Sequence, residues 1–204
     1  MRCLLCMKEM GKGSIRDVLF EEDIICEECR RQWEERDISF KMDGIRVRSD
    51  YVYNDAFSSC LVQYKECFDE ALKDVFLYRK KKKIRRMYRS YTLCMMPSGR
   101  KKMEERGFSH LAGMFECVGL PVMEPFEKKD ESDQKQKDLK ERMKMIDNIV
   151  LKEGISLPKK IVLCDDTLTT GSTLKGALST IDKSSHQIEI YCASMNRRWL
   201  EEMH

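Results

Sequence analysis

The stretch Ile161-Val-Leu-Cys-Asp-Asp-Thr-Leu-Thr-Thr-Gly-Ser-Thr-Leu174 decides the fold of this chain. Four apolar residues are typical of a buried strand, and a helical pattern begins near Thr173. Free backbone N–H groups and the positive end of a helix dipole converge at such a turn, which suits a phosphate. Gly171 allows close approach of the backbone. The hydroxyl donors of the turn are Thr169, Thr170, Ser172 and Thr173.

Two carboxylates, Asp165 and Asp166, stand at the end of this strand. They would repel a phosphate, so we interpret them as acceptors for ribose hydroxyls or as outer ligands of Mg²⁺. The turn therefore predicts a ribose-5-phosphate site. The alternative is an ordinary strand-to-helix turn in which Asp and Thr only cap the helix.

The length of 204 residues allows one main domain with a small accessory module. Charged residues make up 36% of the chain, yet the net charge is only +3, so any basic surface is local. No apolar run reaches the ~20 residues of a membrane span, and the N-terminus lacks the apolar core of a signal peptide. We expect a cytoplasmic protein.

Two Cys-x-x-Cys pairs stand near the N-terminus, Cys3 with Cys6 and Cys26 with Cys29. Matched pairs at this separation are typical of a structural zinc site with four thiolate ligands. The alternatives are redox-active pairs or buried core thiols. Since a segment of ~40 residues has little core of its own, zinc would supply its folding energy. We predict a zinc module over residues 1–43 and an α/β domain over residues 44–204.

Strand and helix patterns alternate through the second domain. Strands are expected over residues 44–53, 91–96, 121–124 and 186–193, besides the one already quoted. A long helix capped by Asn54 or Asp55, with apolar positions reaching Val75, and a second over residues 101–118 lie between them. Residues 127–147 are expected to form a loop and then a helix. This alternation predicts a mainly parallel sheet flanked by helices, with ligands beyond the carboxyl ends of its strands.

A basic run covers residues 79–89. It can contact nucleic-acid phosphates, with neighbouring tyrosines stacking on bases, or it can be a solvated helix end; both interpretations stay open. The candidate nucleic-acid contacts are Lys80, Lys81, Lys82, Lys83, Arg85 and Arg86.

A second turn, over residues 97–110, is a candidate site for a pyrophosphate or similar anion, or else a plain surface helix. The residues assigned to this pyrophosphate side are Pro97, Ser98, Arg100 and Arg106. His110, the one histidine in a promising place, is not assigned as a general base. No catalytic residue is identified.

The chain resembles the ComF family of competence proteins. The matching segments are the four cysteines, Gln63-Tyr-Lys65 followed by Phe68-Asp69, Arg106-Gly-Phe-Ser-His110, residues 136–142, and residues 165–173. Met95-Met-Pro-Ser98 departs from the family's Val-Pro-Val-Pro, and Leu168 replaces its usual aromatic residue.

The resemblance implies a type I phosphoribosyltransferase-like domain that binds phosphoribosyl pyrophosphate (PRPP) with Mg²⁺. The implied PRPP-binding residues are Asp165, Asp166, Thr167, Leu168, Thr169, Thr170, Gly171, Ser172 and Thr173. It also implies a role in natural transformation, handling single-stranded DNA with a helicase-like competence ATPase as partner.

Two other functions stay open: an active phosphoribosyltransferase on an unidentified acceptor, and a non-catalytic scaffold that binds a partner through its zinc module. The sequence also leaves open whether residues 127–136 close over a ligand.

Overall fold

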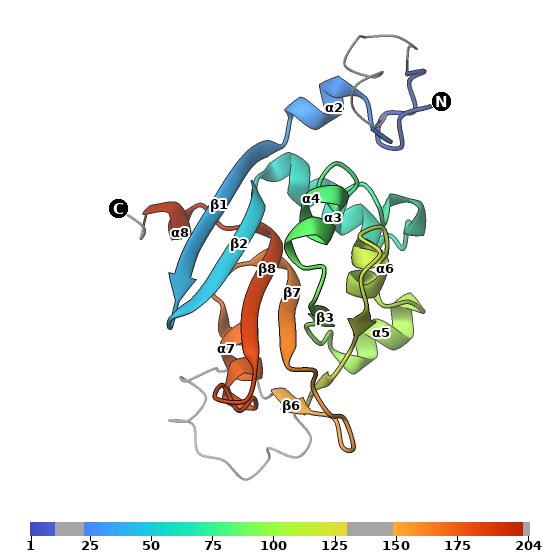
Figure 1. Cartoon of the computed structure of the whole chain (residues 1–204). Helices are drawn as coiled ribbons and strands as arrows, with labels where there is room; N and C mark the ends of the chain where they lie inside the picture. The colour runs from blue at the N-terminus through green and yellow to red at the C-terminus, as the bar shows by residue number, and fades with distance from the viewer. Residues whose placement is uncertain (11–22, 130–148, 202–204) are drawn as a thin grey trace.

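The computed structural model describes residues 1–10, 23–129 and 149–201. Its elements follow one another as α2 (Glu27–Arg31), β1 (Glu34–Met42), β2 (Ile45–Val52), α3 (Asp55–Glu66), the 3-10 turn η1 (Glu70–Leu72), α4 (Lys81–Met87), β3 (Thr92–Met95), α5 (Arg100–Arg106), α6 (His110–Glu116), β4 (Val122–Met123), β5 (Phe126–Lys128), β6 (Ile149–Leu151), β7 (Lys160–Leu168), α7 (Ser172–Ser179), β8 (Gln187–Met195) and α8 (Arg198–Glu201) (Figure 1).

A six-stranded sheet in the order β1-β2-β8-β7-β3-β4 forms the centre of the molecule. The β1–β2 pair is antiparallel, and every other pair in this sheet is parallel. The apolar runs at Ile161 and Ile190 lie on the two central strands and are fully buried, as expected for parallel strands covered on both faces. The predicted α/β class with a mainly parallel sheet is confirmed.

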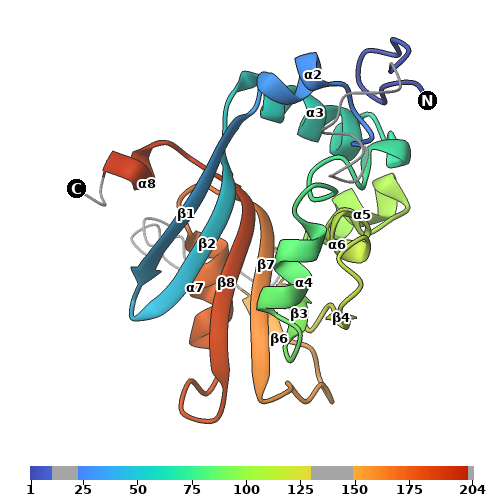
Figure 2. The same cartoon turned by 45° about the horizontal axis from the view of Figure 1, so that its top comes forward.

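Helices lie on both faces of the sheet. Figure 2 shows α7 behind the strands and α4 in front of β7. Tyr191 of β8 contacts the rings of Tyr88, after α4, and Phe115, on α6, at centroid distances of 6.2 and 5.8 Å. Residues that lie on the Tyr191 side of the sheet therefore share a face with α4 and α6. None of the described helices is both long and apolar enough to cross a bilayer.

Arg30 connects the N-terminal segment to the sheet domain through a hydrogen bond and an aromatic contact. Its guanidinium donates two hydrogen bonds to Asp23, both of 2.9 Å, and a third of 3.1 Å to the carbonyl of Val75. It also lies 4.8 Å from the ring of Trp33, which packs between Tyr51, Phe57 and Phe76. β1 pairs with β2 across residue 43, and the division into 1–43 and 44–204 stays a prediction.

Two long predicted helices are shorter than expected. The first ends at Glu66, because Phe68 adopts φ 59° and the side chain of Gln63 donates to Asp69; Phe68 is half exposed rather than packed. The second is split into α5 and α6 at Gly107, whose φ of 78° is the left-handed conformation that ends a helix. Asn54 caps α3 as predicted, by accepting from Phe57 N.

A small antiparallel sheet, β5 with β6, was not predicted. It joins Phe126–Lys128 to Ile149–Leu151, which are the segments on either side of residues 130–148. The helix expected in the second half of 127–147 lies outside the described residues. β5 replaces the start of the predicted loop.

Candidate functional site

The four N-terminal cysteines converge on one point. Their sulfur atoms all lie within 4.8 Å of one another. Cys3 Sγ is 3.8 Å from Cys29 Sγ, and Cys6 Sγ is 3.6 Å from Cys26 Sγ. Four thiolates bound tetrahedrally at ~2.3 Å from zinc would be spaced by roughly 3.8 Å. The cluster is therefore compatible with a zinc ion held by Cys3, Cys6, Cys26 and Cys29.

Backbone groups already support this cluster. The amide of Cys26 donates to Cys3 Sγ at 3.2 Å, as an amide does to a metal-bound thiolate. The neighbouring basic side chains are used differently: Lys8 pairs with Glu28 at 2.9 Å, and Arg30 with Asp23. Arg30 therefore connects the second knuckle to the core instead of offsetting the charge of the sulfurs.

The strand before the predicted phosphate turn is longer than expected. β7 continues through both acids to Leu168, which pairs with Met195 of β8. The side chains of Thr167 and Leu168 are buried, and Thr167 Oγ1 lies 2.8 Å from Ser194 Oγ. These two residues have structural roles, and only their backbone groups are available to a ligand.

The turn itself consists of Thr169, Thr170 and Gly171, and α7 begins at Ser172. Gly171 has φ 74° and is the N-cap residue. Thr170 Oγ1 accepts from Ser172 N at 3.3 Å and donates to Ser172 Oγ at 3.0 Å, so one amide of the turn has an internal partner. Thr169 and Thr170 are exposed.

Helix α8 contacts the turn at residues 169–171 through hydrogen bonds, a contact that the sequence did not predict. Trp199 Nε1 donates to the carbonyl of Thr169 at 2.7 Å, and Arg198 donates to the same oxygen. The indole stacks on Phe40 of β1 at 5.7 Å, and a Cβ on Gly171 would lie 3.5 Å from it. The position of the turn is thus fixed by residues from both ends of the sheet domain.

A network of polar side chains surrounds Asp166, at the end of β7. Lys65 Nζ lies 2.7 Å from Asp166 Oδ2, and His110 Nε2 lies 2.8 Å from the same oxygen. Arg106 Nη1 is 2.9 Å from His110 Nδ1, and Arg106 Nε donates to the carbonyl of Lys65 at 2.8 Å. Because a guanidinium can only donate, Nδ1 accepts and Nε2–H donates to Asp166. His110 is therefore a neutral imidazole that joins Arg106 to Asp166.

The protonation behaviour of this network follows from its burial and its charges. Burial lowers the pKa of His110, and Lys65 and Arg106 act in the same direction against the opposing effect of Asp166. Burial alone would raise the pKa of Asp166, but His110 and Lys65 hold it below its usual range. Burial and the adjacent Asp166 raise the pKa of Asp165, against the opposing effects of Lys65 and Lys128. The two carboxyl groups are thus electrostatically distinct, because among the described residues Lys65 is hydrogen-bonded to Asp166 and not to Asp165.

The residues of the predicted pyrophosphate side follow β3. The amide of Met96 donates to Cys164 O at 2.9 Å, so Pro97 and Ser98 lie next to the end of β7. Ser98 Oγ is 3.3 Å from His110 Nδ1. The Arg106 side chain is only 2% exposed and is held within the network. Arg100 begins α5, and its side chain lies outside the described residues.

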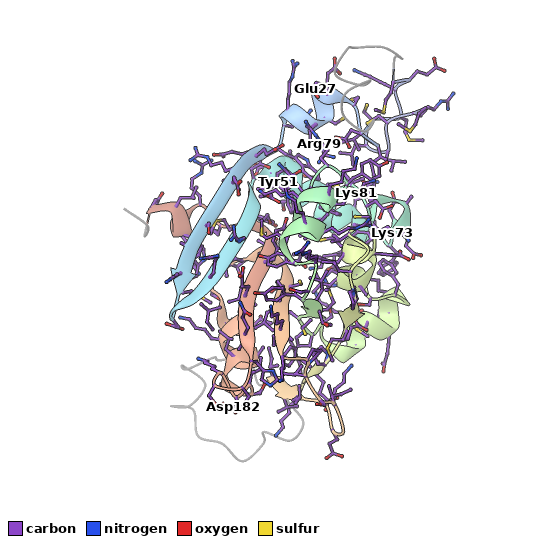
Figure 3. All side chains as sticks on the ribbon, viewed as in Figure 1. Glu27, Tyr51, Lys73, Arg79, Lys81 and Asp182 are labelled. Carbon is purple, nitrogen blue, oxygen red and sulfur yellow. The ribbon has the colours of Figure 1, made fainter. Side chains whose placement is uncertain are left out.

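Several members of the basic run are paired within the molecule. Lys80 pairs with Glu35, and Lys83 lies 2.7 Å from Asp50 and 2.9 Å from Asp37. Arg79 Nε lies 3.8 Å from Asp23 Oδ2, at the end of the domain that bears α2 (Figure 3).

The remaining basic residues of the run differ in their surroundings. Arg85 donates to the carbonyl of Val118 at 2.6 Å, and Lys81 Nζ lies 3.6 Å from the centre of the Tyr78 ring. Lys82 and Arg86 are exposed. Tyr88 and Tyr91 are buried, so neither is available to stack on a base.

The chain is similar to two characterised competence proteins. It is 24% identical over 209 residues to competence protein ComFC of Streptococcus pneumoniae, which covers 90% of this chain and 94% of that protein. The chain is ComFC-like. It is also 28% identical over 129 residues to competence protein ComFC of Bacillus subtilis, covering 62% of this chain and 54% of that protein. No family model matches the chain.

The similarity confirms the resemblance to the ComF family, whereas the phosphoribosyltransferase-like assignment stays a prediction. Two residues of the Asp166 network were not assigned to the site from the sequence. Lys65 supported only the family resemblance, and His110 was given no role. The four-residue spacing of Arg106 and His110 was the available signal, but Gly107 interrupts the helix between them.

Proposed function

We propose that this chain acts in competence, as a cytoplasmic protein that assists the handling of single-stranded transforming DNA and carries a pocket for PRPP or a related ribose phosphate. The single observation that carries the competence role is the similarity to ComFC of Streptococcus pneumoniae over 90% of the chain. The pocket is argued from the end of β7 and the turn that follows it.

The turn at residues 169–171 is suited to a 5′-phosphate. Gly171 takes a left-handed conformation directly before an eight-residue helix, so the first amides of α7 face the turn. The exposed hydroxyl of Thr169 adds a donor. Trp199 and Arg198 both donate to the Thr169 carbonyl, which fixes the position of the turn before a ligand binds.

Asp165 is the carboxylate that this proposal assigns to the ribose. Asp166 is already bound to Lys65 and His110, whereas no side chain of a cation or of His110 donates to Asp165 among the described residues. A diol is a donor pair that a carboxylate accepts well. Mg²⁺ would be held by the ligand's pyrophosphate, water and this carboxylate, in keeping with its preference for oxygen ligands. Zinc at the cysteine cluster would have a structural role.

Calorimetric titration with PRPP and Mg²⁺ tests the pocket. Wild type should bind, and Asp165→Asn should weaken binding at least ~10-fold, because Mg²⁺ favours the ionised form of Asp165 and a hydrogen bond to a charged group contributes about 1.5–3 kcal/mol. Glu153→Gln, which removes an exposed carboxylate outside the site, is the matched control and should bind as wild type does. Absence of binding by wild type would overturn the pocket and favour the scaffold function.

The same material separates binding from catalysis. Release of pyrophosphate when PRPP is mixed with candidate bases and amines would indicate an active phosphoribosyltransferase. Binding without release would indicate a ligand-sensing or structural use of the pocket. Co-purification with a helicase-like competence ATPase tests the proposed partner.

A further inference from the structure

The face of the sheet next to α4 is only partly covered. Figure 2 shows α4 in front of β7. In the same view, no described helix covers the lower parts of β1 and β2. Ser39 and Lys41 on β1, Arg46 on β2 and Gln187 at the start of β8 are exposed. We call this surface the open sheet face and define its cationic members as Lys41, Arg46, Arg48 and Lys160.

These cations share one face with α4. Arg48 pairs in register with Tyr191, and Tyr191 contacts the ring of Tyr88 directly after α4. Tyr91 contacts the Tyr88 ring, and Lys160 Nζ lies 5.8 Å from the Tyr91 ring. The four basic residues therefore project on the same side of β1, β2, β8 and β7.

Two cations on this face occupy directly opposed positions on neighbouring antiparallel strands, an arrangement that is unfavourable in a sheet. Lys41 and Arg46 are directly opposite each other in the β1–β2 ladder. Like charges in opposed positions of an antiparallel pair destabilise it. Neither side chain has an ion pair or hydrogen bond within the described ranges. An anionic partner laid across the hairpin would relieve this repulsion.

Arg48 is only partly available to a ligand, because its side chain is 23% exposed and forms an ion pair with Glu189. Its Nε is 3.6 Å from Glu189 Oε2, too far for a hydrogen bond, and both atoms are buried without a hydrogen-bond partner in the described part of the chain. Asp50 lies on the same face, where it accepts from Tyr191 and is paired with Lys83. Glu189 is opposed by four cations, so the described part of the open sheet face keeps an excess of positive charge. The paired Lys80 and Lys83 contrast with it, since both are held by acids.

We propose that the open sheet face binds the phosphate backbone of single-stranded nucleic acid. This rests on the proposed function and moves the contact from the start of α4, where Lys80 and Lys83 are neutralised, to the ends of the strands away from the predicted ribose-phosphate turn. Cations spread over neighbouring strands ~4.8 Å apart match a linear polyanion. Because Tyr88 and Tyr91 are buried, binding depends on charge and is insensitive to base sequence.

Fluorescence anisotropy with an oligothymidylate of about 20 nucleotides tests this assignment. The variant Lys41→Gln/Arg46→Gln should weaken binding by roughly 5-fold for each cation at about 0.1 M salt, and should reduce the slope of log K against log salt by about 0.7 per cation. Both side chains are exposed and mutually repulsive, so the variant should melt no lower than wild type.

Two further variants serve as controls, and the first removes as many charges as the test variant does. Lys101→Gln/Lys175→Gln removes exposed cations from α5 and α7, away from the open sheet face, and should bind as wild type does. Lys80→Gln removes a cation paired with Glu35 and should have little effect.

The outcomes separate this proposal from the proposed function. If wild type binds but Lys41→Gln/Arg46→Gln binds equally well, the assignment to this face is wrong while DNA handling stands. If wild type does not bind, both are wrong. Equal losses in Lys101→Gln/Lys175→Gln would indicate binding by net charge alone and overturn the assignment. So would equally effective competition by polyglutamate of matched charge, which would indicate a protein partner.

Discussion

The four-cysteine cluster and the Asp166 network both concentrate negative charge, and they neutralise it in different ways. Around Asp166 the chain supplies its own cation, Lys65, and its own donor, His110. At the cluster Lys8, Arg30 and Arg31 are paired with Glu28, Asp23 and Glu27, so these three cations are engaged away from the sulfurs, and a bound metal would supply the compensating charge. The comparison predicts that the Asp166 network forms on folding alone and that the stability of the N-terminal knuckle depends on a bound metal.

Removing the metal should have the largest effect. We expect Cys26→Ser, or treatment with a chelator, to unfold the described segments 1–10 and 23–33, because structural zinc contributes on the order of 10 kcal/mol in small modules. Metal content and limited proteolysis would measure this.

The control for that experiment is Cys67→Ser, which changes an exposed thiol outside the cluster and should retain full metal content. A Cys26→Ser protein with wild-type metal content and protease resistance would remove the contrast between the two regions.

Loss of the internal cation should have the next largest effect. Lys65→Met leaves the buried carboxylate of Asp166 beside His110 without its ammonium partner. Breaking a buried pair costs about 3–5 kcal/mol, and we expect roughly 2–3 here because Lys65 is 23% exposed. Urea unfolding of Lys65→Met, Asp166→Asn and the double variant gives the coupling energy. Additive effects would show that the pair is not a unit.

The two adjacent acids should respond in opposite directions to neutralisation. Because the folded pKa of Asp166 is depressed, its contribution to stability is present above the unfolded value of ~3.9 and is lost as pH falls through the folded pKa. The folded pKa of Asp165 is raised, so folding is favoured by its protonated form and stability falls as pH rises above ~3.9.

At neutral pH, Asp165→Asn should therefore raise the free energy of unfolding by about 1 kcal/mol, while Asp166→Asn lowers it. Unfolding curves recorded between acidic and neutral pH check both signs. A decrease in both variants would mean that the two carboxyl groups are not distinguished by their surroundings.

The smallest effect is expected behind the phosphate turn. Trp199→Phe removes the Nε1–H donor to Thr169 O but keeps an aromatic ring against Phe40. We expect a loss of about 1 kcal/mol or less in PRPP affinity, with unchanged global stability, since one neutral hydrogen bond is involved. Calorimetry measures the first quantity and thermal unfolding the second. Wild-type affinity would show that Arg198 alone fixes the carbonyl.

The sheet could be predicted from the sequence because its central strands are continuous apolar runs, as at Ile161, and the cysteine cluster because its ligands are paired locally. Elements defined by a single residue's backbone were missed: Gly107 splits one helix and Phe68 ends another.

The Asp166 network was missed for another reason. It brings together Lys65, Arg106, His110 and Asp166 from separate elements, and that proximity exists only after the strands have paired. The supporting contact from Trp199 is likewise non-local, since it lies thirty residues from Thr169.

The chain has two tryptophans, which lie in different parts of the molecule. Trp33 lies beneath Arg30, at the junction of the knuckle with the aromatic core, and Trp199 holds the turn after β7. Their emission is thus a pair of intrinsic optical probes, one for events at the sulfur cluster and one for occupancy of the turn. Single-tryptophan versions of the protein would allow metal loading and sugar-phosphate loading to be followed separately, without any attached dye.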